Sequence, residues 1–483
     1  MVPVDYLNED GDKAALAVIK LPAQSETEYK GAILMNPGGP GGSGLRSSWQ
    51  VELDFLIRAI SHTPAALWVG NSTPRVKFFP SKEEHSQWLA VPDHWTTVFN
   101  TTSDEIPHLW ASAQVIAQLA EQRDAGFMNY ISTDNIAREM LRINEAAGQA
   151  KLQYWGFSQS LPSSYGTVLG LTFATIFQCA LIFLVFQETN FSSNFQHKVE
   201  RVLDMDRYYR NEWQDNTADA DMQSFFDGCV AAGPDRCAFF SPTATEISNG
   251  LDHLYDSILA QPVPFVTPSS YGIVDYTVLR AAVRNAMYSP YNYFSDLAEG
   301  LALLAAGDGS RIYALEETAY NPSSVEDLFA YWETVKGLSG FSDLLFPRRI
   351  SCSWWWWWWW WYRHKVPIRN GRAHSPDMAV PCAVATKAHA VVITLLSPIT
   401  ANTSYPVLFI GNTADPLTPL SLAKKTSRAF PGSVVLTQNS SGHTSLAAWS
   451  ACRNAHVQAY FQNGTLPDDE TVCEVESEMF PVS

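Results

Sequence analysis

The chain has 483 residues, a net charge of −17 and a pI near 5.0. It is long enough to bury the core of an enzyme, as one large domain with an insertion or as roughly two or three smaller domains. The acidic balance, without any block of Lys and Arg, argues against nucleic acid or an anionic membrane surface as the main partner.

The seven cysteines lack the paired spacing, with each other and with histidines, that marks a zinc site, so we expect no metal ion and no cofactor. Cys229 and Cys237 are close enough in the chain to form a local disulfide. The first residues, MVPVDYLNED, carry neither the basic nor the apolar region of a signal peptide, which favours a cytosolic protein or a chain written without its leader. Glycosylation acceptor motifs instead favour a secreted, oxidising setting. They lie at Asn71, Asn100, Asn190, Asn402, Asn439 and Asn463.

Two short apolar runs, at residues 14–21 and 31–35, end in turn signals and predict two strands. The second run leads into a glycine-rich loop, NPGGPGGSG, at residues 36–44. Such a loop is a tight connection, a phosphate cradle or a loop that binds an oxyanion. The phosphate cradle is disfavoured, because no Gly-Lys-Ser/Thr ending follows and the two prolines remove N–H donors.

After an irregular region at residues 45–107, residues 108–123 and 132–147 predict two amphipathic helices. In the second, apolar residues recur at helical spacing, Ser132 or Thr133 caps the start, and a glycine ends the helix. Strand, helix and strand in this order predict an α/β domain with a mainly parallel sheet.

Residues 151–177 have the pattern of a buried strand that runs through a turn of small residues into a helix. A serine hydrolase carries its nucleophile at such a place, in a Gly-x-Ser-x-Gly turn. Here the motif is split. GFS at residues 156–158 supplies the first half, and SYG at residues 164–166 supplies the second, with its serine six positions later (164 minus 158).

Residues 168–186 form an uncharged apolar run about long enough to span a bilayer. Because clusters of Lys and Arg are missing from its flanks, we favour a buried helix with an ill-fitting extension over a transmembrane helix, and we expect no membrane contact. We place the next strand at residues 199–203.

Residues 206–345 change to acidic and aromatic helical patterns. They predict a helical cap over the core or, alternatively, a second structural domain. A run of eight tryptophans follows at residues 354–361, and we treat it as low-complexity sequence without a functional role.

Residues 405–410 predict a buried strand shortly before Asp415, and residues 434–436 predict another before His443, 28 positions later (443 minus 415). Taken alone, Asp415 fits a turn before Pro416, and His443 fits an ordinary exposed histidine. Serine hydrolysis needs a base for the hydroxyl proton, an acid that orients the base, and N–H donors for the oxyanion. The order glycine-rich loop, Ser, Asp and His, each after a strand, is that of an α/β hydrolase.

At these motifs the chain resembles the secreted tripeptidyl aminopeptidase-like α/β hydrolases. The resemblance rests on the glycine-rich loop, the two halves of the split turn, GNTADPLTP at residues 411–419 and SGHTS at residues 441–445. Residues 397–476 look like the C-terminal domain of that family. The resemblance implies an α/β-hydrolase fold, with a mainly parallel sheet flanked by helices and a helical cap. It also implies an exopeptidase that removes short peptides from the free N-termini of peptide substrates.

The resemblance further implies a catalytic triad with Asp415 as acid, His443 as base and either Ser158 or Ser164 as nucleophile. Ser158 keeps a glycine two residues before it, but a Leu-Pro pair soon afterwards hinders a helix from starting there. Ser164 directly precedes the predicted helix, so we favour Ser164.

The oxyanion would be stabilised by backbone N–H groups. We assign them to Tyr165, at the N-terminus of the predicted helix, and to Gly38 and Gly39 of the glycine-rich loop.

The chain also departs from the family pattern. Six extra residues in the split turn and a segment at residues 178–196 look inserted, and one family strand is reduced to residues 68–74. These departures leave two alternatives open: an inactive glycoprotein with a hydrolase fold from mis-joined coding segments, and an esterase. The predicted division of the chain is 1–205 (N-terminal part of the core), 206–350 (helical cap), 351–396 (aberrant segment) and 397–483 (C-terminal part of the core).

Overall fold

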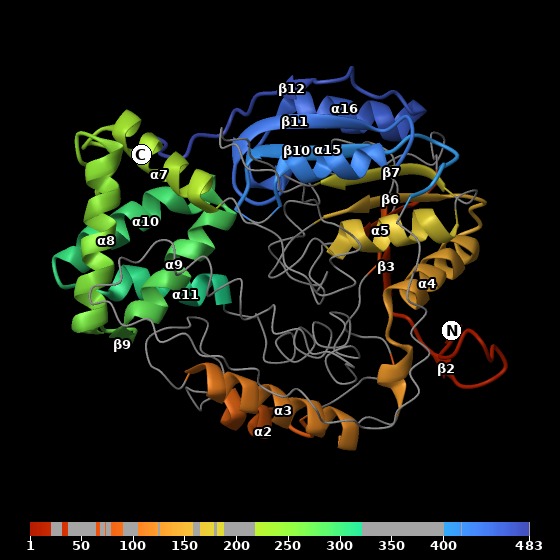
Figure 1. The fold of residues 1–483 in the computed structure, drawn as a ribbon, viewed down its shortest axis with the longest axis horizontal. Coiled ribbons are helices and arrows are strands. Elements are labelled where there is room, and N and C mark those ends of the chain that lie inside the picture. The colour runs from red at the N-terminus through yellow and green to blue at the C-terminus, as the bar shows by residue number, and fades with distance from the viewer. Residues whose placement is uncertain are drawn as a thin grey trace, which may run out of the picture.

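The computed structural model describes residues 1–20, 31–36, 64–67, 73, 79–89, 105–123, 126–157, 165–177, 181–187, 218–320, 400–416 and 418–482. Within these ranges the chain forms an eight-stranded sheet with the order β12-β11-β10-β7-β6-β4-β5-β3 (Figure 1). Its strands are β3 (Val18–Lys20), β4 (Ile33–Asn36), β5 (Pro64–Leu67), β6 (Leu152–Gly156), β7 (Leu181–Gln187), β10 (Leu408–Ala414), β11 (Val434–Ser441) and β12 (Val472–Cys473).

Neighbouring strands of this sheet pair in parallel, except that β3 pairs antiparallel with β5. Because parallel strands need crossover connections, helices fall between them and cover both faces of the sheet. The carboxyl ends of β4, β6, β7, β10 and β11 therefore lie along one edge. The predicted α/β fold with a mainly parallel sheet is confirmed.

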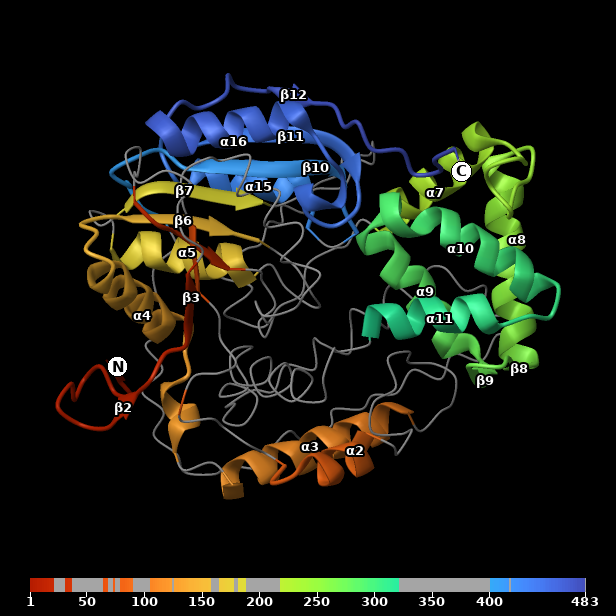
Figure 2. The same ribbon diagram turned by 180° about the vertical axis from the view of Figure 1, so that it is seen from behind.

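Side chains of the strands alternate between two packed layers. On β6, Tyr154 packs into one layer, whereas Trp155 packs into the other against Phe461, with ring centroids 5.8 Å apart. In Figures 1 and 2, α4 and α5 lie on one side of the strands and α16 lies on the other. The flanking helices are α4 (Thr133–Ala146), α5 (Tyr165–Ile176), α15 (Leu420–Arg428) and α16 (Ala451–Asn463).

The predicted helix at residues 132–147 is α4, and its ends are as expected. Ser132 Oγ accepts a hydrogen bond from the N–H of Asn135, and Gly148 has φ +74° just after the helix. The predicted helix at residues 108–123 is also present, as α3. The remaining elements of this half are β1 (Val2–Pro3), β2 (Lys13–Ala14), α2 (Lys82–Leu89), α3 (Glu105–Arg123) and η2 (Phe127–Tyr130).

The apolar run at residues 168–186 is a helix followed by a strand, which corrects the predicted buried helix with an ill-fitting extension. Helix α5 ends at Ile176, and β7 then forms a central strand between β6 and β10. The strand lies within the segment at residues 178–196 that looked inserted, and the rest of that segment lies outside the described residues. A strand with parallel neighbours on both sides is a continuous apolar run, so periodicity cannot separate it from a buried helix. The strand expected at residues 199–203 lies outside the described residues. No helix in the described ranges is long and apolar enough to cross a membrane.

A strand that the sequence did not predict, β5, lies just before residues 68–74, to which a family strand looked reduced. Its residues, PAAL, pair with β4 on one side and with β3 on the other. Pro and Ala are poor strand formers, which is why the sequence pattern did not predict this strand. Its main-chain bonds nevertheless satisfy the edge of β4.

Helices α7 to α11 form a separate unit beyond one end of the sheet (Figure 1). They enclose their own apolar core, and the predicted disulfide between Cys229 and Cys237 is formed inside it. A short antiparallel hairpin, β8 and β9, was not predicted. The expected domain boundaries at residues 205, 350 and 396 lie outside the described residues and stay predictions. The elements are α7 (Ala218–Ala232), α8 (Ala244–Ala260), β8 (Val263–Val266), β9 (Tyr271–Val274), α9 (Tyr276–Tyr288), α10 (Pro290–Ala305) and α11 (Ser310–Tyr320).

The C-terminal tail ties this helical unit to the sheet. Phe480 is buried in the core of the helical unit, and Arg236 donates from Nη1 to the Phe480 carbonyl at 3.0 Å. Both views place the C-terminus beside α7 (Figures 1 and 2).

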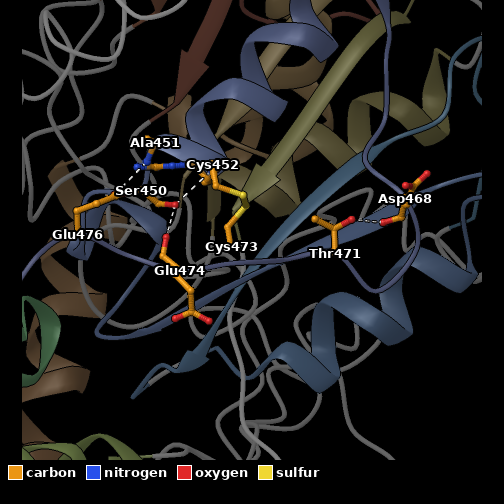
Figure 3. Close-up of a disulfide and its surroundings, with 9 residues drawn as sticks. Ser450, Ala451, Cys452, Asp468, Thr471, Cys473, Glu474 and Glu476 are labelled. Atoms are coloured by element: carbon orange, nitrogen blue, oxygen red, sulfur yellow. Dashed lines mark hydrogen bonds between the residues drawn. A yellow bond between two sulfur atoms is a disulfide. The ribbon is translucent and has the colours of Figure 1, made fainter.

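A second disulfide, between Cys452 of α16 and Cys473 of β12, joins the outer strand to its covering helix (Figure 3). The same junction is held by hydrogen bonds. Ser450 donates from Oγ to the Glu474 carbonyl at 2.6 Å, and Glu476 accepts the N–H of Ala451 at 3.1 Å. The carboxylate of Glu476 thus lies at the N-terminus of α16, where a negative charge is favoured.

Replacing both Cys452 and Cys473 with Ser is expected to lower the free energy of unfolding by about 3 kcal/mol, because the bond closes a loop of the unfolded chain. The sequence separation is 21 residues. Urea unfolding followed by circular dichroism measures the change. An unchanged urea midpoint would show that the disulfide adds nothing to stability.

Candidate active site

Asp415 and His443 meet at the edge where the parallel strands end. Asp415 directly follows β10, and His443 comes two residues after β11, the neighbouring strand. His443 Nδ1 lies 2.9 Å from Oδ2 and 3.0 Å from Oδ1 of Asp415, and both side chains are buried. Since a carboxylate only accepts, this geometry places the imidazole proton on Nδ1 and leaves Nε2 as the basic nitrogen.

Backbone N–H groups fix the carboxylate of Asp415. Oδ1 accepts from the N–H of Thr418 at 2.9 Å, and Oδ2 accepts from the N–H of Thr444 at 2.8 Å. The bond to the N–H of Thr418, three residues later, closes the turn that the Asp-Pro pair predicted. The carboxylate of Asp415 therefore stabilises the loop that carries it and also contacts His443.

The turn that carries His443 has an uncommon backbone. Gly442 has φ +97°, and Thr444 has φ +68° with ψ 161°. In a β-branched residue such a conformation costs on the order of 1–3 kcal/mol, so surrounding bonds must hold it. Asn412 supplies two of them, donating from Nδ2 to the carbonyls of Gly442 at 2.9 Å and Thr444 at 2.7 Å. The sequence interpretation missed Asn412, whose only signal was its position three residues before Asp415.

Buried polar side chains continue beneath this turn. Arg453 of α16 donates from Nη1 to Ser445 Oγ at 2.8 Å, and Gln438 of β11 donates from Nε2 to the Ser445 carbonyl at 3.1 Å. Burial lowers the pKa of Arg453 to about 10, and the nearby Glu476 opposes this shift. The short helix η4 (Ser445–Ala447) is thereby tied to both β11 and α16.

The two halves of the split turn come together despite the residues between them. A Cβ on Gly156 would lie 2.5 Å from the carbonyl oxygen of Gly166, and a Cβ on Gly166 would lie 2.3 Å from that of Phe157. The N–H of Gly166 donates to the Phe157 carbonyl at 3.2 Å, and Tyr154 donates from Oη to the Gly166 carbonyl at 2.7 Å. The end of β6 and the first turn of α5 are thus packed backbone to backbone. This approach requires glycine at both positions.

Four of the predicted site residues, Ser158, Ser164, Gly38 and Gly39, lie outside the described residues. The nearest residues that the structure describes are Asn36, Phe157 and Tyr165. Tyr165 is the first residue of α5, so its N–H has no acceptor within the helix.

The strand before the glycine-rich loop ends beside the split turn, because the N–H of Phe157 donates to the carbonyl of Asn36 at 2.8 Å. Strand β7 lies between β6 and β10, which puts the carboxyl ends of β6 and β10 about 10 Å apart.

Cys452, His456 and Cys473 are the one group in the described ranges whose atom types and spacing suit a metal ion. The two sulfur atoms are joined in the disulfide, so they are not available as thiolate ligands.

Comparison with known proteins places these features in a family. Residues 371–473, which include Asp415 and His443, match the family described as TAP-like protein. The chain is an α/β-hydrolase-fold protein with a TAP-like C-terminal domain. It is 25% identical, over 491 residues, to the Tripeptidyl aminopeptidase of Streptomyces coelicolor, and the match covers 98% of this chain and 82% of the relative.

The chain is also similar to two other curated proteins. The Tripeptidyl aminopeptidase of Streptomyces lividans is likewise 25% identical over 491 residues, with the same coverage of both chains. Serine protease Hip1 of Mycobacterium tuberculosis is 23% identical over 501 residues, covering 98% of this chain and 86% of the relative. These similarities support a hydrolase related to serine peptidases.

Replacing Tyr154 with Phe is expected to lower the free energy of unfolding of this TAP-like hydrolase by about 1–2 kcal/mol. The change removes the hydroxyl that donates to the Gly166 carbonyl and leaves that buried acceptor with one partner fewer. Thermal unfolding measures the loss. An unchanged melting temperature would mean that this bond does not help to close the junction between β6 and α5.

Proposed function

We propose that the chain is a serine exopeptidase that releases short peptides, tripeptides above all, from free N-termini. The observation that carries the proposal is the buried hydrogen bond between His443 and Asp415 at the carboxyl edge of the sheet. The close packing of Gly156 against Gly166 supports it, because that junction is where a hydrolase presents its nucleophile. The names of the Streptomyces relatives support the tripeptide specificity.

In this proposal Ser164 is the nucleophile and Ser158 the alternative. Ser164 directly precedes Tyr165, the first residue of α5. A serine at a helix N-terminus profits from the partial positive charge of the helix and from backbone N–H groups. Ser158 instead directly follows Phe157, at the end of the strand rather than at the helix N-terminus. The Phe157 carbonyl already accepts a hydrogen bond from the N–H of Gly166.

The reaction follows from these positions. The serine oxygen attacks the scissile carbonyl carbon while His443 takes the hydroxyl proton at Nε2. The N–H of Tyr165, with those of Gly38 and Gly39, stabilises the resulting oxyanion. The proton then passes to the leaving amine, the C–N bond breaks and an acyl-enzyme remains. Water attacks the acyl carbon and gives a proton to His443. The ester bond to the serine then breaks, His443 returns the proton to the serine oxygen, and the short peptide is released. Asp415 holds the imidazole in the productive tautomer throughout.

A comparison of substrates tests this proposal. We expect hydrolysis of a tripeptide anilide with a free amine, and a rate at least about tenfold lower for its N-acetylated form, because an exopeptidase uses binding energy from the free terminus. A higher kcat/KM for a short acyl ester than for the tripeptide anilide would instead indicate an esterase. No turnover of any of the three by folded protein would indicate an inactive fold.

We further propose a secreted glycoprotein. The two disulfides support an oxidising setting, and Asn402 and Asn463 are exposed acceptor residues. Intact-mass measurement before and after treatment with an N-glycosidase, on protein from a eukaryotic host, tests this. An unchanged mass would contradict the glycoprotein assignment.

A further inference from the structure

A carboxyl group of the helical unit reaches into the core beside the candidate site. Asp221 of α7 is fully buried, and its Oδ1 accepts the N–H of Gly442 at 3.1 Å. Gly442 is the residue just before His443. The other oxygen, Oδ2, is buried and meets no hydrogen-bond partner among the described residues.

Other contacts from the helical unit converge on the same turn. Ser441 donates from Oγ to Ser224 Oγ of α7 at 2.7 Å, and the N–H of His443 donates to the carbonyl of Tyr288, at the end of α9, at 3.0 Å. A Cβ on Gly442 would lie 2.4 Å from Cδ of Pro290, the first residue of α10. The turn is therefore enclosed by three helices of the unit, and its backbone has no room to shift toward them.

The charge of Asp221 matters, because it lies near the carboxylate of Asp415. Burial raises the pKa of Asp221 well above its usual range, Asp415 raises it further, and the Gly442 N–H opposes the shift. Tyr291 of α10 is the other titratable group that interacts with it, and burial raises the pKa of that phenol to about 12. Both shifts favour the protonated, uncharged form of the group, and in that form Asp221 adds no second anion beside the Asp415 carboxylate.

We propose that Asp221 is a positioning residue, whose carboxyl group accepts the Gly442 N–H and thereby keeps the His443 imidazole aligned on Asp415. The inference rests on the proposed serine-hydrolase function. It also gives the helical unit a role at the candidate site. The unit supplies hydrogen-bond acceptors for the backbone of the turn that carries His443.

Three variants test the role. Asp221→Ala removes the acceptor and is expected to lower kcat/KM for the tripeptide anilide about tenfold to a hundredfold, mainly in kcat. Asp221→Asn keeps an oxygen acceptor without charge and is expected to stay within about threefold of wild type. Asp227→Ala changes an exposed carboxylate on the same helix, which bonds only to Gln223 in the described contacts, and serves as the matched control.

The profile of kcat/KM against pH separates positioning from an effect of charge. Because Asp221 acts in the proposal as a hydrogen-bond acceptor and not through a charge, Asp221→Asn is expected to move the acidic limb of the profile by less than about 0.3 pH unit. If Asp221→Asn is as impaired as Asp221→Ala, or shifts that limb by a full unit, the carboxyl group acts through its charge and the proposal fails. Full activity of Asp221→Ala would also overturn it.

A spectroscopic measurement distinguishes a failure of the positioning role from a failure of the proposed function. The far-downfield proton resonance of His443 Nδ1–H is expected in wild type and Asp221→Asn, and is expected to shift or disappear in Asp221→Ala. This result does not depend on turnover. Wild type that shows the resonance but hydrolyses nothing would refute the function and leave the positioning role standing. An unaltered resonance in folded Asp221→Ala would refute the positioning role.

The pH dependence of stability gives an independent check. A group whose pKa is raised on folding binds its proton more tightly in the folded state, so its contribution to stability is lost as pH rises above the unfolded pKa, about 4 for Asp. Asp221→Asn lacks this loss. The melting temperature of Asp221→Asn relative to wild type is therefore expected to increase as the pH rises above about 4, and a constant difference would contradict a raised pKa of Asp221.

Discussion

Asp415→Asn and His443→Ala are each expected to lower kcat/KM for a tripeptide anilide by about ten-thousandfold while leaving the fold intact. His443→Ala removes the base. Asp415→Asn keeps the size of the side chain but presents an amide to the imidazole, so the proton is no longer held on Nδ1. Steady-state kinetics measures the loss, and circular dichroism confirms the fold.

The matched control is His253→Ala, which removes an exposed histidine of α8 in the helical unit and is expected to change neither activity nor stability. The account would be contradicted if His443→Ala, correctly folded, kept more than about a hundredth of wild-type activity, because removing the base of a triad costs far more.

Gly166→Ala is expected to have the largest effect on stability, about 3 kcal/mol, because its Cβ would enter the backbone of Phe157. The strand and the helix of the split turn would have to separate, and we expect activity to be lost with them. Urea unfolding gives the stability change, and the yield of folded protein shows whether the chain still closes this junction.

Gly250→Ala is the control, because its Cβ would lie 3.5 Å from Phe239, an ordinary contact, inside α8. This substitution is expected to stabilise the protein by about 0.5–1 kcal/mol through helix propensity. Equal effects of the two substitutions would show that the approach of Gly166 to Phe157 is not a special requirement of the fold.

Sequence patterns predicted the elements whose signal is local. Ser132 and the following glycine marked the ends of α4, and the apolar runs before Asp415 and His443 marked the strands β10 and β11. The meeting of Asp415 and His443 could be expected, because carboxyl ends of parallel strands share one edge.

Other features depend on tertiary context and left no readable pattern. β7 is a uniformly apolar run in the interior of the sheet, and β5 is built from Pro and Ala. Their strand character comes from the main chains of their neighbours rather than from their own residues. Asp221 and Asn412 lie far from His443 in the sequence, and only the fold brings their polar atoms to the turn beside it.

The interrupted turn is the feature on which the functional account depends most. The six-residue spacing between Ser158 and Ser164 suggested a damaged motif, yet the glycines on either side of it still pack together. The account therefore predicts that a serine between them remains in reach of His443.

Labelling with a fluorophosphonate probe, followed by peptide mapping, tests this claim most directly. The account predicts one modified residue within residues 151–177, at Ser164 or, failing that, at Ser158, and no labelling of His443→Ala. The account would be contradicted by folded wild-type protein that takes up no probe, or by a label at a serine elsewhere in the chain.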